Sequence, residues 1–156
     1  MGNSTPGLIY YLYRLGGGVA PRLAPRLGYP LFGAVGELAH ALNRTGRDAA
    51  RSNIRHILGP DAPQAQVNRL ARAAFSTVAY NTHDLFRLPT LTAAQLDRMV
   101  EVQGWENVVT ALSLGKGIVI ASAHFGNAEM VVAALLGRGL SITIPAERIR
   151  DRKSVV

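Results

Sequence analysis

The sequence predicts an α/β fold in which amino-terminal helices lead into a parallel β-α-β sheet. Up to residue 87, apolar side chains recur at the three- and four-residue spacing of helices. Residues 118–123 form a continuous apolar run of strand length, which is typical of a strand buried on both faces. After Pro89 the expected order is strand, helix, strand, helix, strand, and this order predicts parallel strands joined by right-handed crossovers.

The helical part is expected to be interrupted by prolines. Residues 8–15 predict a short helix, and Pro21, Pro25 and Pro30 predict that residues 16–30 form a loop or very short helical turns. Further helices are expected at 31–43, 47–58 and 62–87. The last of these has an apolar stripe that is expected to face the core: Val67, Leu70, Ala71, Ala74, Phe75, Val78, Thr82, Leu85 and Phe86.

The elements of the sheet part are expected to be short. They are a strand at 99–103, a helix at 105–114, a strand at 118–123, a helix at 127–136 and a strand at 140–144. A sheet of about three strands is small for its class. We therefore expect a truncated sheet, in a chain that is the amino-terminal fragment of a longer protein.

The last six residues differ in character from the rest. Residues 151–156 match the translation of a widely used short-read sequencing adapter, so we expect them to be a scar outside the fold. A genuine polar end is the alternative. The predicted organisation is a helical, membrane-associating section at 1–60, the first half of the α/β domain at 61–150, and the scar at 151–156.

Basic side chains are concentrated at the start of the chain. The formal net charge is +7, and residues 1–60 carry seven arginines against Glu37 and Asp48, a net charge of +5. Nucleic acid and an anionic membrane are the two partners that such a section can face. The aromatic residues among the arginines favour the membrane interface: Tyr10, Tyr11, Tyr13, Tyr29 and Phe32.

No segment is expected to cross a bilayer. The longest uncharged stretch in the first 60 residues covers 1–13, whereas a spanning helix needs roughly 18–20 apolar residues. A peripheral or monotopic amphipathic segment is the favoured interpretation. The alternative is an apolar helix that packs on the core of the protein itself.

The most informative stretch is 115–129, around His124. His124 follows the carboxyl end of the predicted buried strand, where open α/β sheets place their ligands. Gly126 allows the backbone to approach a substrate closely. Asn127 is a suitable N-cap for the next helix, and Glu129 falls in the first turn of that helix.

This arrangement suits acyl transfer. The neutral imidazole of His124 can take the proton of an attacking hydroxyl, and the carboxylate of Glu129 can fix its tautomer. Backbone N–H groups at the helix start can stabilise the oxyanion, and no serine or cysteine nucleophile is needed when the hydroxyl attacks a thioester directly. By residue type alone a structural histidine is the alternative, because one histidine near one glutamate is weak evidence.

The sequence His-Phe-Gly-Asn-Ala-Glu at 124–129 resembles the H-x4-D/E motif of the lysophospholipid acyltransferase superfamily. With the Gly-Lys-Gly turn and apolar run before it, this stretch is similar to the lipid A late acyltransferases and the related phosphatidylinositol mannoside acyltransferases. The usual form of the motif in these two families is His-x-Gly-Asn-x-Glu. Gly104-Trp105-Glu106-Asn107 and Asn53 also fit the pattern, and the resemblance covers about residues 8–150.

The resemblance implies a sheet of the glycerolipid acyltransferase type and a role for each motif residue. His124 is implied as the catalytic base and Glu129 as its partner. Gly126, Asn127 and Glu147 are implied as substrate-binding residues, with Glu147 beside the acceptor groove; a solvated loop charge is the alternative for Glu147. The family's later arginine and a further acidic residue would follow residue 150, so we expect this chain by itself to be inactive.

The resemblance also implies the substrates. A fatty acyl group would pass from a thioester of coenzyme A or acyl carrier protein to a hydroxyl of a membrane glycolipid, of the lipid A precursor or phosphatidylinositol mannoside type. Neither a further cofactor nor a metal nor nucleic acid is expected. The expected location is the cytoplasmic face of the bacterial inner membrane, with peripheral or monotopic attachment.

Three rival functions remain. A glycerol-phosphate acceptor is disfavoured by the Gly-Asn that follows His-Phe. A non-catalytic membrane-binding fragment is consistent with the short chain. A nucleic-acid binder rests on the positive charge alone.

The other histidines are expected to have structural or surface roles. His40 and His56 lie on predicted amphipathic helices without paired ligands. His83 stands next to Asp84, but adjacent residues on a helix point apart, so this pair does not suggest a metal site. Cysteine is absent, which excludes disulfides and thiolate metal sites. Arginines 44, 47, 51 and 55 recur on one helix face, typical of a solvated face or of one that meets phospholipid head groups.

Overall fold

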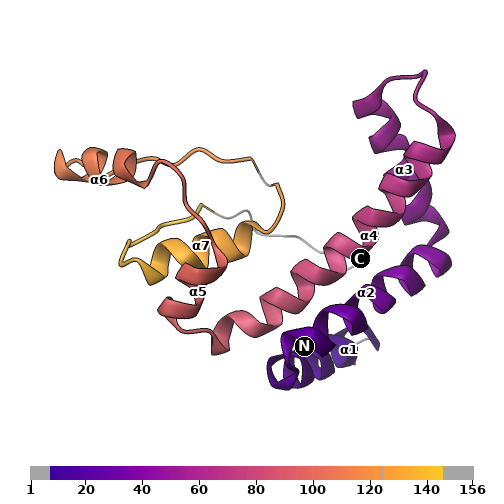
Figure 1. The fold of residues 1–156 in the computed structure, drawn as a ribbon, viewed down its shortest axis with the longest axis horizontal. Helices are drawn as coiled ribbons and strands as arrows, with labels where there is room; N and C mark the ends of the chain where they lie inside the picture. Colours follow the sequence, from indigo (N-terminus) through magenta and orange to yellow (C-terminus); the bar gives the residue numbers. More distant parts are fainter. Residues whose placement is uncertain (1–7, 124, 146–156) are drawn as a thin grey trace, which may run out of the picture.

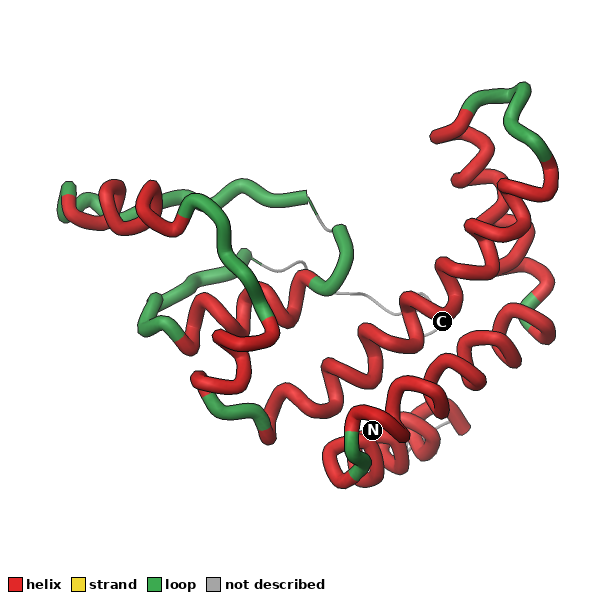
Figure 2. Tube along the Cα trace, in the orientation of Figure 1, coloured by secondary structure: helices red, strands yellow, loops and turns green. Residues whose placement is uncertain are grey.

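The computed structural model describes residues 8–123 and 125–145. Within these residues the chain is built from helices, and no segment of them forms a β-strand (Figures 1 and 2). The elements, in chain order, are α1 (Leu8–Val19), η1 (Ala20–Arg22), α2 (Pro25–Leu42), α3 (Arg44–Leu58), α4 (Gln64–Arg87), η2 (Leu88–Thr90), α5 (Ala93–Met99), α6 (Trp105–Ser113) and α7 (Ala128–Gly137).

The predicted parallel β-α-β sheet is therefore wrong for the described residues. Residues 118–123 and 140–144 have no regular secondary structure, and 99–103 contains the end of α5 and a turn. Val119, the second residue of the apolar run at 118–123, is 98% exposed. An apolar run forms a strand only where a neighbouring strand takes its backbone hydrogen bonds and a layer covers its side chains. Within the part of the chain that the structure describes, these segments have neither.

The prediction of a loop or very short helical turns at 16–30 holds only for residues 20–24, which form η1 and the connection to α2, and is wrong for the rest. Helix α1 continues to Val19, and α2 begins at Pro25, where a missing N–H costs nothing because the first helical turn has no acceptor for it. Pro30 lies inside α2 and removes one hydrogen bond of that helix. The helix persists because α2 packs along most of its length against α4, and that packing outweighs the lost bond.

Glycines bring α2 close to α4. A Cβ at Gly36 would lie 2.9 Å from the carbonyl oxygen of Phe75 and from the Cα of Ser76. A Cβ at Gly28 would overlap the imidazole of His83. The two helices consequently lie side by side, as Figure 1 shows, and their contact buries much of the core of the amino-terminal section.

The buried face of α4 is made of residues four apart or a multiple of four apart. Val67, Ala71, Ala79 and His83 are buried along this line. Part of the predicted stripe is misplaced, because Val78 and Leu85, which were expected in the core, are exposed. A stripe of i, i+3 and i+4 positions covers a wide arc of the helix, and the glycine-rich α2 fits against only one side of it.

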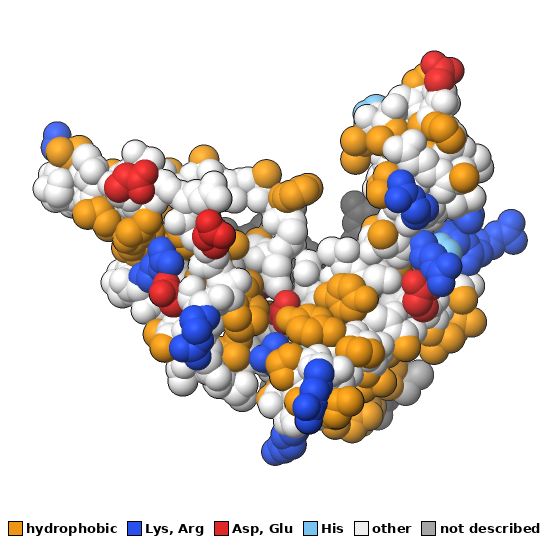
Figure 3. Space-filling view, viewed as in Figure 1, with side chains coloured by type: hydrophobic (Ala, Val, Ile, Leu, Met, Phe, Trp, Pro, Cys, Tyr) orange, Lys and Arg blue, Asp and Glu red, His pale blue; other side chains and the backbone are white. Residues whose placement is uncertain are grey.

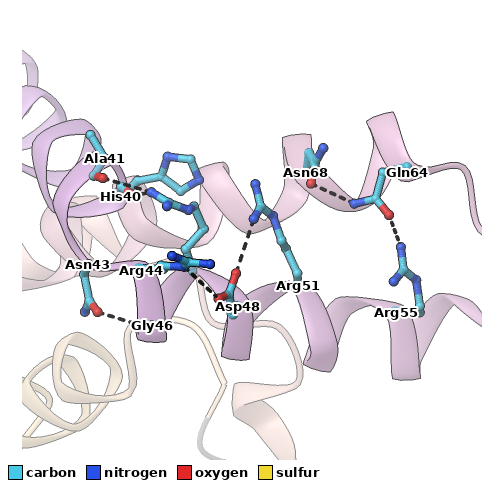
Figure 4. A network of polar contacts seen from close by, with 11 residues as sticks. His40, Ala41, Asn43, Arg44, Gly46, Asp48, Arg51, Arg55, Gln64 and Asn68 are labelled. Carbon is cyan, nitrogen blue, oxygen red and sulfur yellow. Dashed lines mark hydrogen bonds and ion pairs between the residues drawn. The ribbon is translucent and has the colours of Figure 1, made fainter.

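A polar network ties α3 to α2 and α4 (Figure 4). Asn43 caps α3 by accepting a hydrogen bond from the Gly46 N–H at 2.8 Å. Arg47 donates to the backbone carbonyls of His40 and Ala41 at the end of α2, and Arg55 donates to Gln64 at the start of α4. The predicted end of α3 at Gly59 is confirmed, with a φ of 94° that favours glycine.

Helices α5, α6 and α7 form the second part of the described fold. Thr92 and Gln95 form a reciprocal capping box at the start of α5. The Arg138 guanidinium donates from Nε and Nη2 to Asp97 Oδ1 at 2.8 and 2.6 Å, and its Cζ lies 4.9 Å from the centroid of the Trp105 ring. These contacts tie the end of α7 to α5 and α6. Helix α7 packs mainly on α5 and also contacts α4, and Figure 1 shows α5 and α7 together on one side of the long α4.

Candidate functional site

The motif loop, residues 125–127, lies between α4 and α7. His124 itself lies outside the described residues, and so does Glu147. Phe125 is 89% exposed, so its ring does not pack in the core of the described fold. The geometry of the site is therefore carried by Gly126, Asn127 and the helix that follows.

Gly126 has a left-handed backbone conformation. Its φ is +68°, a region that side chains with a Cβ rarely adopt. Its carbonyl oxygen accepts a hydrogen bond from the side-chain amide of Asn81 on α4 at 3.0 Å. The turn that follows His124 is thus fixed both by its glycine and by a contact from a distant helix.

Asn127 is the N-cap of α7, as the sequence predicts. Its Oδ1 accepts a hydrogen bond from the Met130 N–H at 3.2 Å. Its Nδ2 donates to Asp84 Oδ2 on α4 at 3.1 Å. Both ends of the amide are used, so one side chain sets the start of α7 and joins it to α4.

Asp84 receives a second hydrogen bond, from helix α2. The Tyr29 hydroxyl donates to Asp84 Oδ1 at 2.7 Å, and Arg87 Nη1 lies 3.8 Å from the same oxygen. Burial raises the pKa of Tyr29, and its hydrogen bond and proximity to Asp84 raise the pKa further, so Tyr29 remains the donor at neutral pH. Asp84 connects α2, α4 and α7.

Glu129 is the second residue of α7 and is exposed. Backbone N–H groups of the first helical turn lack acceptors within the helix, so the start of α7 is able to stabilise an anion in front of it. In the sequence, the predicted base precedes this turn and the predicted carboxylate lies inside it, which is the order that the predicted hydroxyl-activating site requires. The roles of His124, Gly126, Asn127, Glu129 and Glu147 remain predictions.

His83, by contrast, is fully buried between α4 and α2. Its ring packs against those of Tyr29 and Phe32, with centroids 4.8 and 4.9 Å away, and neither ring nitrogen has a hydrogen-bond partner. Burial lowers the pKa of His83, and Arg87 lowers it further, against the opposing effect of Asp84. Within residues 8–123 and 125–145, no three metal-binding side chains come together.

Two surface hollows lie elsewhere on the described fold, and neither is lined by residues 125–129. An apolar groove of about 470 Å³ runs between α2, α3 and α4, with Phe32, Val35, Phe75 and Val78 among its lining residues. A basic hollow of about 510 Å³ lies along α3 and the turn after it: Asp48, Arg51, Ser52, Arg55, His56, Gly59 and Pro60.

Tyr29, Asn81 and Asp84 are the residues of this region that the sequence reasoning missed. Asn81 and Asp84 stand three residues apart on α4, so they share a face. Half of the residues of α4 are polar or charged, so this pair does not stand out in the sequence. The partner loop, more than 40 residues later, is beyond the reach of helical periodicity.

Comparison with known families shows which family the chain belongs to. Residues 7–152 match the model of a family described as bacterial lipid A biosynthesis acyltransferase. The chain belongs to this family. The acyltransferase relationship that the 124–129 motif indicates is therefore confirmed for almost the whole sequence.

Relatives of this chain carry a more specific name. A phosphatidylinositol mannoside acyltransferase of Mycobacterium tuberculosis is 33% identical over 109 residues, which are 67% of this chain and 34% of the relative. A phosphatidylinositol mannoside acyltransferase of Mycolicibacterium smegmatis is 30% identical over 112 residues, 71% of this chain and 36% of the relative. The matched segment therefore spans about a third of each relative's length. No solved structure shows significant similarity.

Proposed function

We propose that the protein containing this chain transfers a fatty acyl group from an acyl thioester to a hydroxyl of a membrane glycolipid. The observation that carries the proposal is the family match over residues 7–152, which includes the His-x4-Glu motif at the start of α7. The capped start of α7 after Gly126 supports it, because free helix N–H groups follow shortly after the proposed base in the sequence.

In the proposed reaction, the neutral imidazole of His124 removes the proton of the acceptor hydroxyl as its oxygen attacks the thioester carbonyl. Glu129 stabilises the imidazolium, and N–H groups at the start of α7 stabilise the oxyanion. The C–S bond then breaks, and the imidazolium returns the proton to the leaving thiolate. The products are an ester and a free thiol of coenzyme A or acyl carrier protein.

The acceptor that we favour is a phosphatidylinositol mannoside. Its support is that relatives sharing about a third of their aligned residues are named for that substrate. A lipid A precursor is the second glycolipid acceptor, supported by the description of the family. We propose Gly126, Asn127 and Glu147 as residues that contact the substrate.

We further propose that residues 1–60 bind the cytoplasmic face of the bacterial inner membrane peripherally. Among the described residues, no helix has the length and apolar character needed to cross a membrane. Instead, α1 and α2 expose large apolar side chains: Tyr10, Tyr11, Leu12, Tyr13 and Leu15 on α1, and Leu27, Leu31, Val35, Leu38 and Leu42 on α2. Basic and hydrophobic side chains lie together over this part of the surface (Figure 3). Both apolar insertion and attraction to anionic lipids are thus available.

The catalytic proposal is tested on the full-length protein that contains this chain. Palmitoyl-coenzyme A and palmitoyl-acyl carrier protein are supplied with a phosphatidylinositol mannoside, a lipid A precursor or lysophosphatidate as acceptor. We expect transfer to a glycolipid, a loss of at least about 100-fold in His124→Ala, and a smaller loss in Glu129→Gln. Glu101→Gln, which removes an exposed carboxylate away from the motif, is the control and should keep the wild-type rate.

Two results would overturn the proposal. One is transfer to lysophosphatidate without transfer to either glycolipid. The other is a His124→Ala variant that retains more than about a tenth of the wild-type rate, since loss of a general base typically costs a factor of 100 or more.

A further inference from the structure

The carboxylate of Asp84 joins two other helices to α4, and the reaction described above gives it no role. Its Oδ1 accepts from the Tyr29 hydroxyl of α2 at 2.7 Å, and its Oδ2 accepts from the Asn127 amide at the start of α7 at 3.1 Å. The Asp84 side chain is only 14% exposed. Hydrogen bonds to a charged group that is largely shielded from water are stronger than their exposed counterparts.

The contact with Asn127 fixes the orientation of its amide. The oxygen end accepts from the Met130 N–H, and the nitrogen end must therefore face Asp84. A rotated amide would place a donor against the Met130 N–H and an acceptor against a carboxylate. Asp84 thus selects the orientation of Asn127 in which that residue caps α7.

A second contact from α4 holds the preceding residue. Asn81, three residues before Asp84, donates to the carbonyl of Gly126. Side chains three apart on a helix lie on one face, so neighbouring positions on α4 hold consecutive residues of the loop. The register of the loop against α4 is therefore specified at two points.

This register bears on the proposed reaction, and the inference rests on that proposed function. The restrained residues Gly126 and Asn127 lie between His124 and Glu129 in the chain. Asn127 sets the first turn of α7, and Glu129 is in that turn. A displacement of about 1 Å in a catalytic group can reduce a rate by about 100-fold.

We propose that Asp84 is a positioning residue for acyl transfer. Through its hydrogen bond to Asn127 it determines where α7 begins, and hence where Glu129, in the first turn of α7, is held. Tyr29 holds the other oxygen of the Asp84 carboxylate and so links this restraint to α2.

The test is an exchange of the two side chains in the full-length protein. In Asn127→Asp, the new carboxylate still caps α7, but its other oxygen faces Asp84 and the donor is lost. In the double variant Asp84→Asn/Asn127→Asp, the amide at 84 donates to the carboxylate at 127 and accepts from Tyr29, so the same pair is restored with its polarity reversed. In the single variant Asp84→Asn, the amide at 84 can rotate. Its oxygen then accepts from the Asn127 amide, and its nitrogen donates to the Tyr29 hydroxyl oxygen.

We expect Asn127→Asp to lower kcat at least tenfold and to change KM by a smaller factor, because a misplaced group affects the chemical step more than binding. Because Asn127 is also proposed to contact the substrate, the recovery in the double variant, rather than the loss in the single variant, measures the role of Asp84. The double variant should recover to within about threefold of the wild-type kcat. Amide hydrogen exchange of Met130 and Val131 should be faster in Asn127→Asp and return to the wild-type rate in the double variant. A general loss of stability would not show such recovery.

Glu37→Gln is the matched control. Glu37 pairs with Arg72 at 2.6 Å, so its change also removes a charged contact between α2 and α4, but far from the motif loop, and kcat should not change. If wild-type protein transfers no acyl group, the proposed function fails. If wild-type protein is active and the double variant is no better than Asn127→Asp in kcat and in exchange, the role of Asp84 is refuted.

Discussion

The Cα of Gly28 lies directly against the imidazole of His83, so that even one methyl group at position 28 would overlap Nε2 of the ring. This contact places a fully buried histidine at the centre of the α2–α4 interface. The absence of a side chain at 28 is therefore what lets α2 pack tightly enough to exclude water from His83. Close packing of this kind responds strongly to small changes in volume.

We accordingly predict that Gly28→Ala destabilises the protein. The added methyl group cannot be accommodated by a flexible chain end, because the imidazole opposite is enclosed, and overpacking of this kind costs about 1–3 kcal/mol. Gly18→Ala is the matched control: Gly18 is also helical, a Cβ there meets nothing within 4 Å, and alanine should stabilise by about 0.5–1 kcal/mol. The free energy of unfolding in urea measures both effects. Equal changes in the free energy of unfolding of the two variants would contradict the close contact between Gly28 and His83.

His83 should make stability depend on pH in mildly acidic solution. The pKa of His83 is lowered from 6.5 in the folded protein, chiefly by burial, with Arg87 adding to the effect and Asp84 opposing it. Below pH 6.5 the unfolded chain binds a proton that the folded protein resists, so the free energy of unfolding falls as the pH falls from 6.5 toward the folded pKa. The contribution is fully present above 6.5.

Urea unfolding of wild-type protein and His83→Gln between pH 7.5 and 5 measures this contribution. The variant does not titrate at this position, so its free energy of unfolding should fall less over this interval than that of the wild type. His40, His56 and His124 are present in both proteins, so the comparison isolates the effect of position 83. A variant with the same pH dependence as the wild type would show that His83 is not the group responsible.

The contact between Arg138 and Trp105 provides a spectroscopic test of the α5–α7 part. Lysine at 138 keeps the charge, but it has a single nitrogen in place of the Nε and Nη2 that both donate to Asp97, and it has no planar group to stack on the indole. Because Asp97 is largely exposed, we expect Arg138→Lys to cost only about 0.5–1 kcal/mol. Trp105, the single tryptophan, should change its fluorescence emission. Arg98→Lys, on the exposed side of α5, should leave the emission unchanged.

Local signals allowed several helices to be predicted from the sequence. The end of α3 at Gly59, the N-cap at Asn127 and the α6 and α7 segments follow from residues within a few positions of each boundary. The capping box that starts α5 is an equally local signal, but the prediction did not use it. It placed a strand at 99–103 instead, because apolar and polar residues alternate there. Such alternation over five residues is too short to separate a strand from a helix end.

The errors arise where distant segments decide the outcome. The apolar run at 118–123 has strand composition, but whether it is a strand depends on a partner segment, and in residues 8–123 and 125–145 none pairs with it. Pro30 should break a helix locally, but the packing of α2 on α4 maintains it. For the same reason the motif residues were predictable from their chemistry, whereas Asp84 and Tyr29 could be found only from the arrangement of α2, α4 and α7.

The exposed leucines of α2 should determine how strongly the protein binds membranes. Leu31 and Leu38 are exposed on one side of α2, and burying a leucine in lipid is worth about 1.5–3 kcal/mol. Replacing both with glutamine should therefore weaken partition into vesicles containing phosphatidylinositol at least tenfold, since each 1.4 kcal/mol is a factor of ten.

Val109→Gln/Leu114→Gln, which changes exposed apolar residues on and after α6, is the control and should bind normally. Raising the salt concentration should weaken binding without abolishing it, because charge supplies only part of the attraction. Unchanged vesicle sedimentation of the α2 variant, or complete release of the wild type by salt alone, would show that this surface does not insert.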